Sequence, residues 1–380
     1  MPWIRRSATQ RLPPTASSSQ APPPDATPSI LFAGFSADSS LIALGTASGV
    51  RVYNASPLRE AAAVGGGAAL MGRGGVAVVE PLERTNILIL VGGGAAPRWP
   101  PNIAVVWDDA AQAAVAEIAL DGAVLAAHLR RDRLVLVTAD EVVEFAVPSL
   151  ERRSATKTPR GNPEGLCALS TAGPAVTCFP GIQEGTITVR TAADEEDAFD
   201  TDDAFWKVHN NALRCIALNA DGSLLATAST EGTLIRVWDT RTRNDVPVAE
   251  LRRGADHSEI FSIAFSHDSS QLCVASDKGS VHVFALPIEG FSEGNTRSAF
   301  KDLGLDAVMP RLIASYVQSE WGSHKFTLEG ESANARFIAS FGPPHSEELV
   351  VVTMLGECYK VSLAEKSTDC KATQYELIGT

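Results

Sequence analysis

The sequence contains no long apolar segment and no closely spaced cysteines. No apolar run approaches the roughly 20 residues that a membrane-spanning helix requires, and the start, MPWIRRSATQ, lacks the apolar stretch of a secretory signal. The 6 cysteines lie far apart and show no C-x-x-C or Cys/His spacing of the kind that holds zinc. We therefore expect a cytoplasmic protein with reduced cysteines and no metal site.

The chain also lacks an excess of positive charge. Lys and Arg number 32 against 45 for Asp and Glu, so the formal net charge is −13. This balance argues against a protein that binds nucleic acid over a broad surface, and any affinity for phosphate must come from a local cluster. The sequence has no nucleophile elbow, metal-ligand spacing or glycine-rich phosphate loop. We expect neither an enzyme nor a bound cofactor.

Two segments are predicted to lie outside the folded core. Residues 1–29 are rich in Pro, Ser, Ala and Thr, so we interpret them as a disordered tail, with a transit peptide as the alternative. DEEDAFDTDD, residues 194–203, is strongly acidic but has neither the glycine turn nor the spacing of a calcium loop. It is interpreted as a solvated loop that faces away from anionic surfaces.

From residue 30 onward, short alternating apolar segments are separated by Gly, Asp-Gly and Asp-Ser turns. DGSLLATASTEGTLIRVWD, from Asp221, aligns with DSSQLCVASDKGSVHVFAL, from Asp268, and DSSLIALGTASGVRVYNA, from Asp38, follows the same scheme. A four-stranded unit of roughly 40–50 residues is the size of a propeller blade, and Trp238-Asp239 matches the WD-type strand ending. The sequence predicts an all-β protein, with a seven-bladed β-propeller over residues 30–365 and a C-terminal tail at 366–380.

Two adjacent arginines follow an apolar strand between the predicted fifth and sixth blades. In ELRRGADHSEIF, Arg252 and Arg253 precede Gly254. Neighbouring strand residues point to opposite sides of a sheet, so the two guanidinium groups can serve separate pockets, each binding a phosphate through two hydrogen bonds. Gly254 would allow a sharp turn or the close approach of a ligand. By itself the motif is weak, because arginine pairs usually lie on solvated surfaces.

Hydrogen-bond donors recur at matching places in the blades on either side of this arginine pair. Those in the blade before it are His209, Ser229, Thr233 and Arg236, and those in the blade after it are Ser276, Lys278, Ser280 and His282. Residues 205–285 as a whole are not net basic. A phosphate site therefore depends on the spatial clustering of these donors.

These motifs resemble the PROPPIN family of seven-bladed propellers that bind polyphosphoinositides, known in animals as WIPI proteins. LRRG at 251–254 matches the family's F/L-R-R-G signature, and its context, LLATASTEGTLIRVWDT before it and IFSIAFSHDSSQLCVASDKGSVHVF after it, matches too. NPEGLCALS from Asn162 and LVGGG from Leu90 also resemble family segments, so the similarity covers nearly all of residues 30–363. With leucine before the arginines, the sequence resembles the branch of the third and fourth animal paralogues most.

The resemblance implies two headgroup sites on the rim, for phosphatidylinositol 3-phosphate and 3,5-bisphosphate. By matching positions, the first comprises His209, Ser229, Thr233, Arg236 and Arg252, and the second comprises Arg253, Ser276, Lys278, Ser280 and His282. The chain departs from the family pattern at Ser280, where Thr is usual, and at Asp256, which follows the R-R-G. These departures predict that the second site is the weaker one.

Residues 286–320 form a stretch that exceeds ordinary loop lengths. With Pro310 suited to a first helical turn, its apolar residues have the spacing of an amphipathic helix: Met309, Leu312, Ile313, Tyr316 and Val317. Two interpretations stay open. The segment packs on the propeller or begins the next strand, or it inserts into the bilayer interface, as the long sixth-blade loop of the family does.

The resemblance implies a propeller that binds phosphoinositides and recruits the autophagy machinery to membranes. A WD-repeat scaffold that binds proteins and hardly any lipid is the alternative. The family's lipid-transfer partner docks on early blades, where Asp38 in FSAD matches a family position. We expect a monomer, without nucleic acid, that is peripheral on preautophagosomal, endosomal or vacuolar membranes and binds the autophagy lipid-transfer protein.

Overall fold

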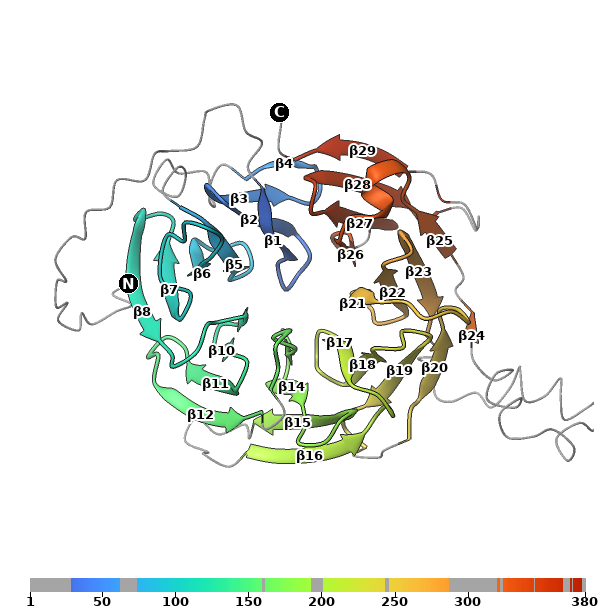
Figure 1. The fold of residues 1–380 in the computed structure, drawn as a ribbon, viewed down its shortest axis with the longest axis horizontal. Helices are drawn as coiled ribbons and strands as arrows, with labels where there is room; N and C mark the ends of the chain where they lie inside the picture. The colour runs from blue at the N-terminus through green and yellow to red at the C-terminus, as the bar shows by residue number, and fades with distance from the viewer. Residues whose placement is uncertain are drawn as a thin grey trace, which may run out of the picture.

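The computed structural model of the chain is a ring of seven small antiparallel sheets around a central axis (Figure 1). It describes residues 29–61, 74–158, 161–192, 201–242, 246–286, 320–321, 324–344, 346–364, 370 and 372–377. Within these ranges the helical structure is one short 3-10 helix, η2 (Gly330–Ala333), and no helix is long and apolar enough to cross a bilayer. The predicted all-β, seven-bladed propeller is confirmed.

In the first four blades, the strands pair in the order in which they occur in the sequence. The first blade contains β1 (Ile30–Phe35), β2 (Leu41–Thr46), β3 (Gly49–Asn54) and β4 (Arg59–Glu60). The second contains β5 (Val76–Pro81), β6 (Ile87–Gly92), β7 (Ile103–Asp108) and β8 (Ala113–Ala119). The third contains β9 (Ala126–Leu129), β10 (Arg133–Val137), β11 (Glu141–Ala146) and β12 (Arg152–Lys157). The fourth contains β13 (Ala168–Leu169), β14 (Val176–Pro180), β15 (Thr186–Ala192) and β16 (Thr201–Lys207).

The later blades include one interruption of this order, because β24 pairs outside its place in the sequence. The fifth blade contains β17 (Leu213–Leu218), β18 (Leu224–Ser229), β19 (Leu234–Asp239) and β20 (Ala249–Arg252), and β24 (Glu320–Trp321) runs parallel to β20 on its outer side. The sixth contains β21 (Ile260–Phe265), β22 (Gln271–Ser276), β23 (Ser280–Ala285) and β25 (His324–Thr327). The seventh contains β26 (Phe337–Phe341), β27 (Glu348–Thr353), β28 (Glu357–Ser362) and β29 (Ala372–Glu376).

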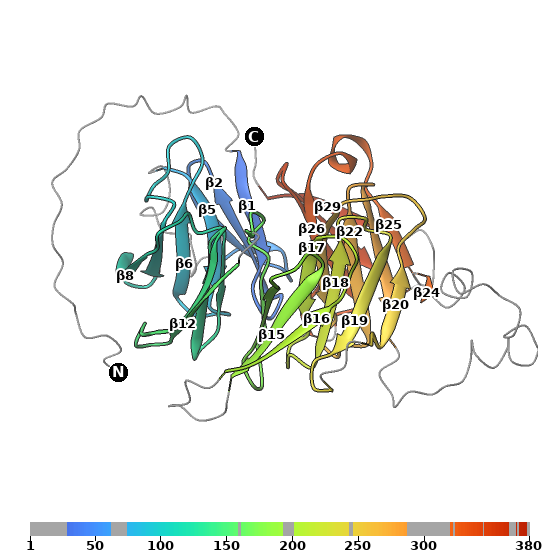
Figure 2. The same ribbon diagram turned by 60° about the horizontal axis from the view of Figure 1, so that its bottom comes forward.

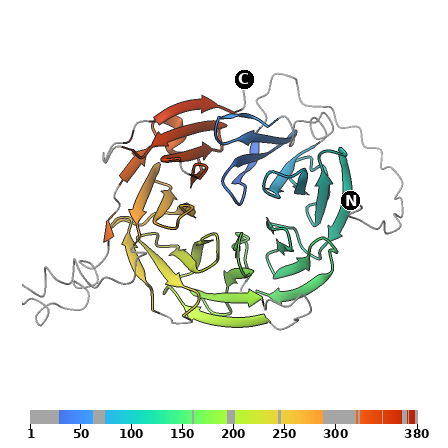
Figure 3. The ribbon, with the colours of Figure 1, turned by 180° about the vertical axis from the view of Figure 1, so that it is seen from behind.

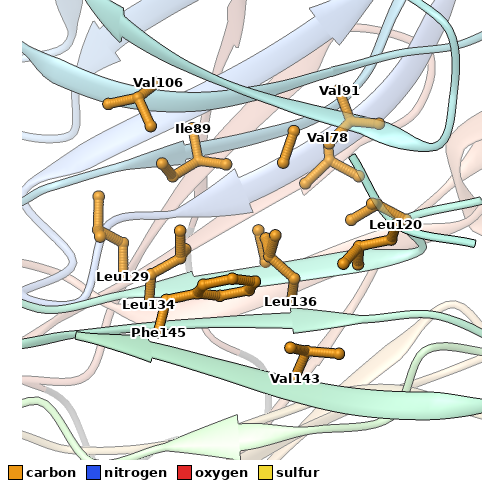
Figure 4. Close-up of a cluster of buried hydrophobic side chains, with 13 residues drawn as sticks. Val78, Ile89, Val91, Val106, Leu120, Leu129, Leu134, Leu136, Val143 and Phe145 are labelled. Carbon is orange, nitrogen blue, oxygen red and sulfur yellow. The ribbon is translucent and has the colours of Figure 1, made fainter. Parts of the chain in front are cut away.

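The hydrophobic core lies between neighbouring blades. Between the second and third blades, Ile89 and Val91 pack with Leu134, Leu136 and Phe145 (Figure 4). A four-stranded sheet cannot cover both of its own faces, so each blade buries them against its two neighbours. Figure 2 shows the blades side by side around the ring. Because both faces of a blade are covered by its neighbours, central strands such as β6 and β10 are apolar along their length.

The ring closes between the first and seventh blades (Figure 3). Tyr53 Oη donates a hydrogen bond to the carbonyl oxygen of Leu377, and Ile42 of the first blade lies in one cluster with Val350 of the seventh. The propeller therefore continues past residue 365, because β29 lies in the segment assigned from sequence to a C-terminal tail. All five residues of this strand are exposed, so it has no apolar alternation that would have revealed it.

Candidate functional site

The paired arginines lie on opposite sides of the fifth blade. Leu251 belongs to the cluster that the fifth blade forms with the sixth, so its strand neighbour Arg252 faces the fourth blade. Arg253 lies just beyond β20 and turns toward the sixth blade, where it interacts electrostatically with His282. Both arginines are buried, with 9% and 7% of their surfaces exposed. The geometry creates two separate junctions, one between the fourth and fifth blades and one between the fifth and sixth.

The first junction contains a neutral histidine beside an ion-paired arginine. His209 lies between β16 and β17, and its Nε2 is 3.0 Å from Thr227 Oγ1. Arg236 on β19 donates from Nε to Glu250 Oε1 at 2.9 Å and from Nη1 to the carbonyl oxygen of Val208 at 2.7 Å. Burial, followed by the charge of Arg236, lowers the pKa of His209 to about 4. The imidazole is therefore neutral at physiological pH.

The other two residues expected in the first site lie at the same end of the fifth blade. Ser229 is buried at the end of β18. Thr233 precedes β19, and its carbonyl oxygen accepts a hydrogen bond from the backbone N–H of Arg253 at 3.0 Å. The alternation of the strands places His209, Ser229, Arg236 and Arg252 at the first junction. Thr233 stands opposite Arg253, the arginine of the other junction, so its assignment to the first site stays a prediction.

The second junction contains a chain of small polar contacts. Ser276 Oγ lies 3.3 Å from Ser280 Oγ, which lies 3.3 Å from His282 Nε2. Burial, followed by the charges of Lys325 and Arg253, lowers the pKa of His282 to about 4. Lys278 is exposed in the turn between β22 and β23.

Arg253 is held in this junction by main-chain groups. Its Nε donates to the carbonyl oxygen of Gly232 at 2.9 Å, and its Nη2 donates to the carbonyl oxygen of Asp256. Burial lowers the pKa of Arg253, while Asp277 and Asp256 act in the opposite direction. Among the residues that the structure describes, no carboxylate forms an ion pair with this guanidinium. A buried cation held by neutral carbonyl groups is a favourable place for an anion.

Two residues of the junctions were missed in the sequence analysis. Gly232 has a φ of +61°, and a Cβ there would meet the carbonyl oxygen of Ser258 at 1.7 Å. Lys325 lies on β25 directly opposite His282. Gly232 occupies the same place in its repeat as Gly279 does in the next one, and both have a positive φ. Alignment of the two repeats could therefore have identified it. Lys325 follows the long loop, where the repeat is interrupted, and so had no comparable signal.

Neither the backbone conformation nor the packing around Gly254 requires a glycine. Its backbone is not in the left-handed region, and a Cβ at this position would meet nothing within 4 Å. Both roles expected for Gly254, in a sharp turn and in the close approach of a ligand, stay predictions.

Asp38 has a structural role that needs no partner. Its Oδ1 accepts hydrogen bonds from Ser36 Oγ at 2.6 Å and from Ser40 Oγ at 2.7 Å, within the turn between β1 and β2. These contacts lower its pKa against the opposing effect of burial. Asp221 and Asp268 bond the serines of their own turns in the same way. Partner binding at Asp38 stays a prediction.

Two sequence predictions fall partly or wholly outside the described residues. The proposed insertion residues, Met309, Leu312, Ile313, Tyr316 and Val317, all lie in 287–319, beyond the described ranges. Of the acidic segment 194–203, the last three residues belong to β16, and Asp203 pairs with Arg190 at 2.7 Å. The interpretation of the whole segment as a solvated loop is therefore wrong at its C-terminal end, where cross-strand pairing with β15 orders it.

The fold and the two junctions define a WD-type β-propeller with a pair of buried arginines that serve adjacent blade interfaces. The chain belongs to the PROPPIN family, whose model matches residues 30–309. It is 38% identical over 206 residues to SVP1-like protein 2 of Emericella nidulans, an alignment that covers 54% of this chain and 62% of that protein. It is 30% identical over 311 residues to Autophagy-related protein 18e of Arabidopsis thaliana, with 81% and 77% covered.

Solved structures show the same fold. Kluyveromyces lactis Hsv2 with its complete loop 6CD superposes with a TM-score of 0.72 at 23% identity, over 92% of this chain and 99% of that chain. KlAtg21 in complex with the coiled-coil of AgAtg16 superposes with a TM-score of 0.68 at 19% identity, over the same shares of the two chains.

Proposed function

We propose that this protein is a binding protein, not an enzyme, which uses the two junctions to hold phosphoinositide headgroups and so attaches to membranes. The observation that carries the proposal is the buried guanidinium of Arg253, whose direct contacts among the described residues are carbonyl groups. Asp277 and Asp256 act on this charge from a distance, but none of the described carboxylates bonds it directly, and an incompletely compensated buried charge is costly. A phosphate group would supply that counter-ion through charge-assisted hydrogen bonds.

The placement of Arg252 and Arg253 on opposite sides of one blade supports two sites instead of one. Two weak sites on the same rigid propeller increase the strength of attachment, because binding at one raises the effective concentration of lipid at the other. We propose phosphatidylinositol 3-phosphate and phosphatidylinositol 3,5-bisphosphate as the ligands. The donors proposed beside the arginines are His209, Ser229, Thr233 and Arg236 at the first junction and Ser276, Lys278, Ser280 and His282 at the second.

We further propose that the membrane-bound propeller recruits components of the autophagy machinery on preautophagosomal, endosomal or vacuolar membranes. Membership of the PROPPIN family and similarity to Autophagy-related protein 18e support this role. A related propeller, KlAtg21, is known in a complex with the coiled-coil of AgAtg16. By analogy, we propose a protein partner, such as an autophagy lipid-transfer protein, that binds a monomeric propeller away from the two junctions.

Flotation with liposomes tests the lipid-binding proposal. Wild-type protein is expected to float with vesicles of phosphatidylcholine that contain either phosphoinositide, and not with phosphatidylcholine alone. Each charge-assisted contact to phosphate contributes roughly 1.5–3 kcal/mol, so Arg252→Thr with Arg253→Thr should reduce binding by about 100-fold or more. A matched control is Arg152→Thr with Arg153→Thr, which removes the same charge from the outer strand of the third blade.

Unchanged flotation of a folded R252T/R253T protein would reject the two junctions as lipid sites. Equal losses in both double variants would indicate a general charge effect. If the wild type itself fails to float with either lipid, the protein is a WD-repeat scaffold that acts through protein partners.

A further inference from the structure

The two junctions are built on equivalent positions of successive blades. In the fifth blade, Arg236 on the third strand lies directly opposite Glu250 on the fourth. In the sixth blade, His282 on the third strand lies directly opposite Lys325 on the fourth. The fourth strand is the outer strand of each of these pairs, and we call its residue the outer position. The outer position of the first junction, Glu250, is therefore negatively charged, and that of the second junction, Lys325, is positively charged.

Packing shows that these outer side chains face their junctions. Leu251 and Ile235 pack toward the sixth blade, so Glu250, one residue away from Leu251, faces the fourth blade and the first junction. Val281 and Phe326 pack toward the seventh blade. Their neighbours His282 and Lys325 consequently face the fifth blade, on the side where Arg253 lies.

At the first junction, the outer carboxylate restricts what an anionic ligand can reach. Glu250 Oε1 accepts the hydrogen bond of Arg236 Nε at 2.9 Å, so part of the binding capacity of that guanidinium is already used. A single phosphate can be bound by Arg252 and the remaining donors. A second phosphate on the same headgroup, closer to the exposed edge of the junction, would approach the carboxylate of Glu250. The two negative charges would repel each other.

At the second junction, the outer strand adds donors instead. Lys325 is exposed beside His282, close enough for its charge to lower the pKa of that histidine. Thr327 lies directly opposite Ser280 and so shares the same face of β25. Arg253, His282 and Lys325 therefore form a row that leads from the buried end of the junction to its exposed edge.

We propose that the second junction, and not the first, binds the headgroup that carries an additional phosphate, with Lys325 contacting that phosphate. This assignment rests on the proposed function and refines it by dividing the two lipids between the two sites. Lys325 acts as the specificity-determining residue, and Glu250 excludes the bisphosphorylated headgroup from the first junction. The second site is then the stronger one for this ligand, despite Asp256 and Ser280.

Calorimetric titration with soluble headgroups tests the assignment without a membrane. The probes are inositol 1,3-bisphosphate and inositol 1,3,5-trisphosphate, which correspond to the headgroups of phosphatidylinositol 3-phosphate and 3,5-bisphosphate. Lys325→Ala is expected to weaken binding of the trisphosphate about 10-fold or more and to change binding of the bisphosphate less than about twofold. The matched control is Lys157→Ala, which removes an exposed lysine from the outer strand of the third blade.

A gain-of-function variant tests the same idea at the other junction. Glu250→Lys reproduces the outer cation of the sixth blade in the fifth, so the protein should then bind a second equivalent of the trisphosphate. Equal losses for both probes in Lys325→Ala, or no loss for either, overturn the assignment, as does an unchanged stoichiometry in a folded Glu250→Lys protein. If the wild type binds neither probe, it is the proposed function that fails.

Discussion

The guanidinium of Arg253 and the main chain of Gly232 are joined by a hydrogen bond of 2.9 Å from Nε to the carbonyl oxygen. Gly232 also lies against Ser258 and Ile260 at the start of the sixth blade, with no room for a side chain. Its φ of +61° is a second reason why this position requires glycine. A residue without a side chain thus determines both how closely the fifth and sixth blades approach and where the second arginine lies.

Gly232→Ala should therefore damage both stability and binding. The added Cβ would meet the Ser258 carbonyl oxygen at 1.7 Å, and the left-handed backbone disfavours alanine, so we expect a loss of about 2–4 kcal/mol in the free energy of unfolding. Chemical denaturation and headgroup titration measure the two effects. Gly254→Ala is the control, because a Cβ there meets nothing within 4 Å, and it should unfold like the wild type. Equal stability of the two variants would contradict the packing argument.

A second prediction concerns the ion pairs of Arg190, one to the third blade and one within its own fourth blade. Arg190 pairs with Glu144 at 3.3 Å and with Asp203 at 2.7 Å, and both Arg190 and Glu144 are buried. In Arg190→Ala the carboxylate of Glu144 keeps its ion pair with Arg133 but loses the hydrogen bond from Arg190, so we expect a loss of about 1.5–3 kcal/mol in unfolding free energy. Arg152→Ala, which breaks a partly exposed pair with Glu141, should cost about 0–1 kcal/mol.

Headgroup titration distinguishes this structural role from a binding role. Arg190 lies outside both junctions, so Arg190→Ala protein that is still folded at low temperature should bind inositol 1,3-bisphosphate as the wild type does. A selective loss of affinity, without a loss of stability, would show that the ion pairs belong to a ligand site.

The lowered pKa of His209 predicts that acid destabilises the propeller. In the folded protein this pKa is about 4, against 6.5 for an unperturbed histidine, because burial and Arg236 disfavour the imidazolium. Below pH 6.5 the unfolded chain binds a proton that the folded protein does not bind until about pH 4, so stability falls as the pH drops through this window. The contribution is on the order of 2–3 kcal/mol.

Urea unfolding between pH 4 and pH 7 measures this dependence. His209→Gln keeps a polar group near Thr227 and should flatten the slope of stability against pH. Identical slopes for the wild type and His209→Gln would mean that the imidazole is protonated equally in the folded and unfolded states.

The apolar spacing in the long loop supplies a prediction from sequence. If the loop inserts into the bilayer, Leu312→Asp with Ile313→Asp should weaken liposome flotation, since burial of apolar surface contributes about 25 cal/mol per Å². Affinity for soluble headgroups should not change, because Arg252 and Arg253 are intact. A lower thermal stability together with losses in both assays would instead favour packing of these residues on the propeller.

Several features of this protein were predictable from the sequence because they repeat locally. The turns at Asp221 and Asp268 align, and in the structure each carboxylate bonds the serine two residues on. The alternation of apolar residues between such turns indicated short strands, and the arginine pair could be placed between two blades. These signals depend on contacts within a few residues, which is the range in which sequence patterns are most informative.

The sequence by itself determined the all-β repeat, the number of blades and the opposite orientation of Arg252 and Arg253. Only the tertiary structure decided which charges face each junction. Glu250 lies opposite Arg236 because their strands pair, although the two residues are 14 positions apart. Lys325 lies opposite His282 in the same way, across the long loop. The exposed strand β29 was likewise placed by pairing with β28 and not by its own side chains. Backbone hydrogen bonds between distant segments leave no trace in the local pattern of side chains, so register and electrostatics at the junctions emerge only when the blades are assembled.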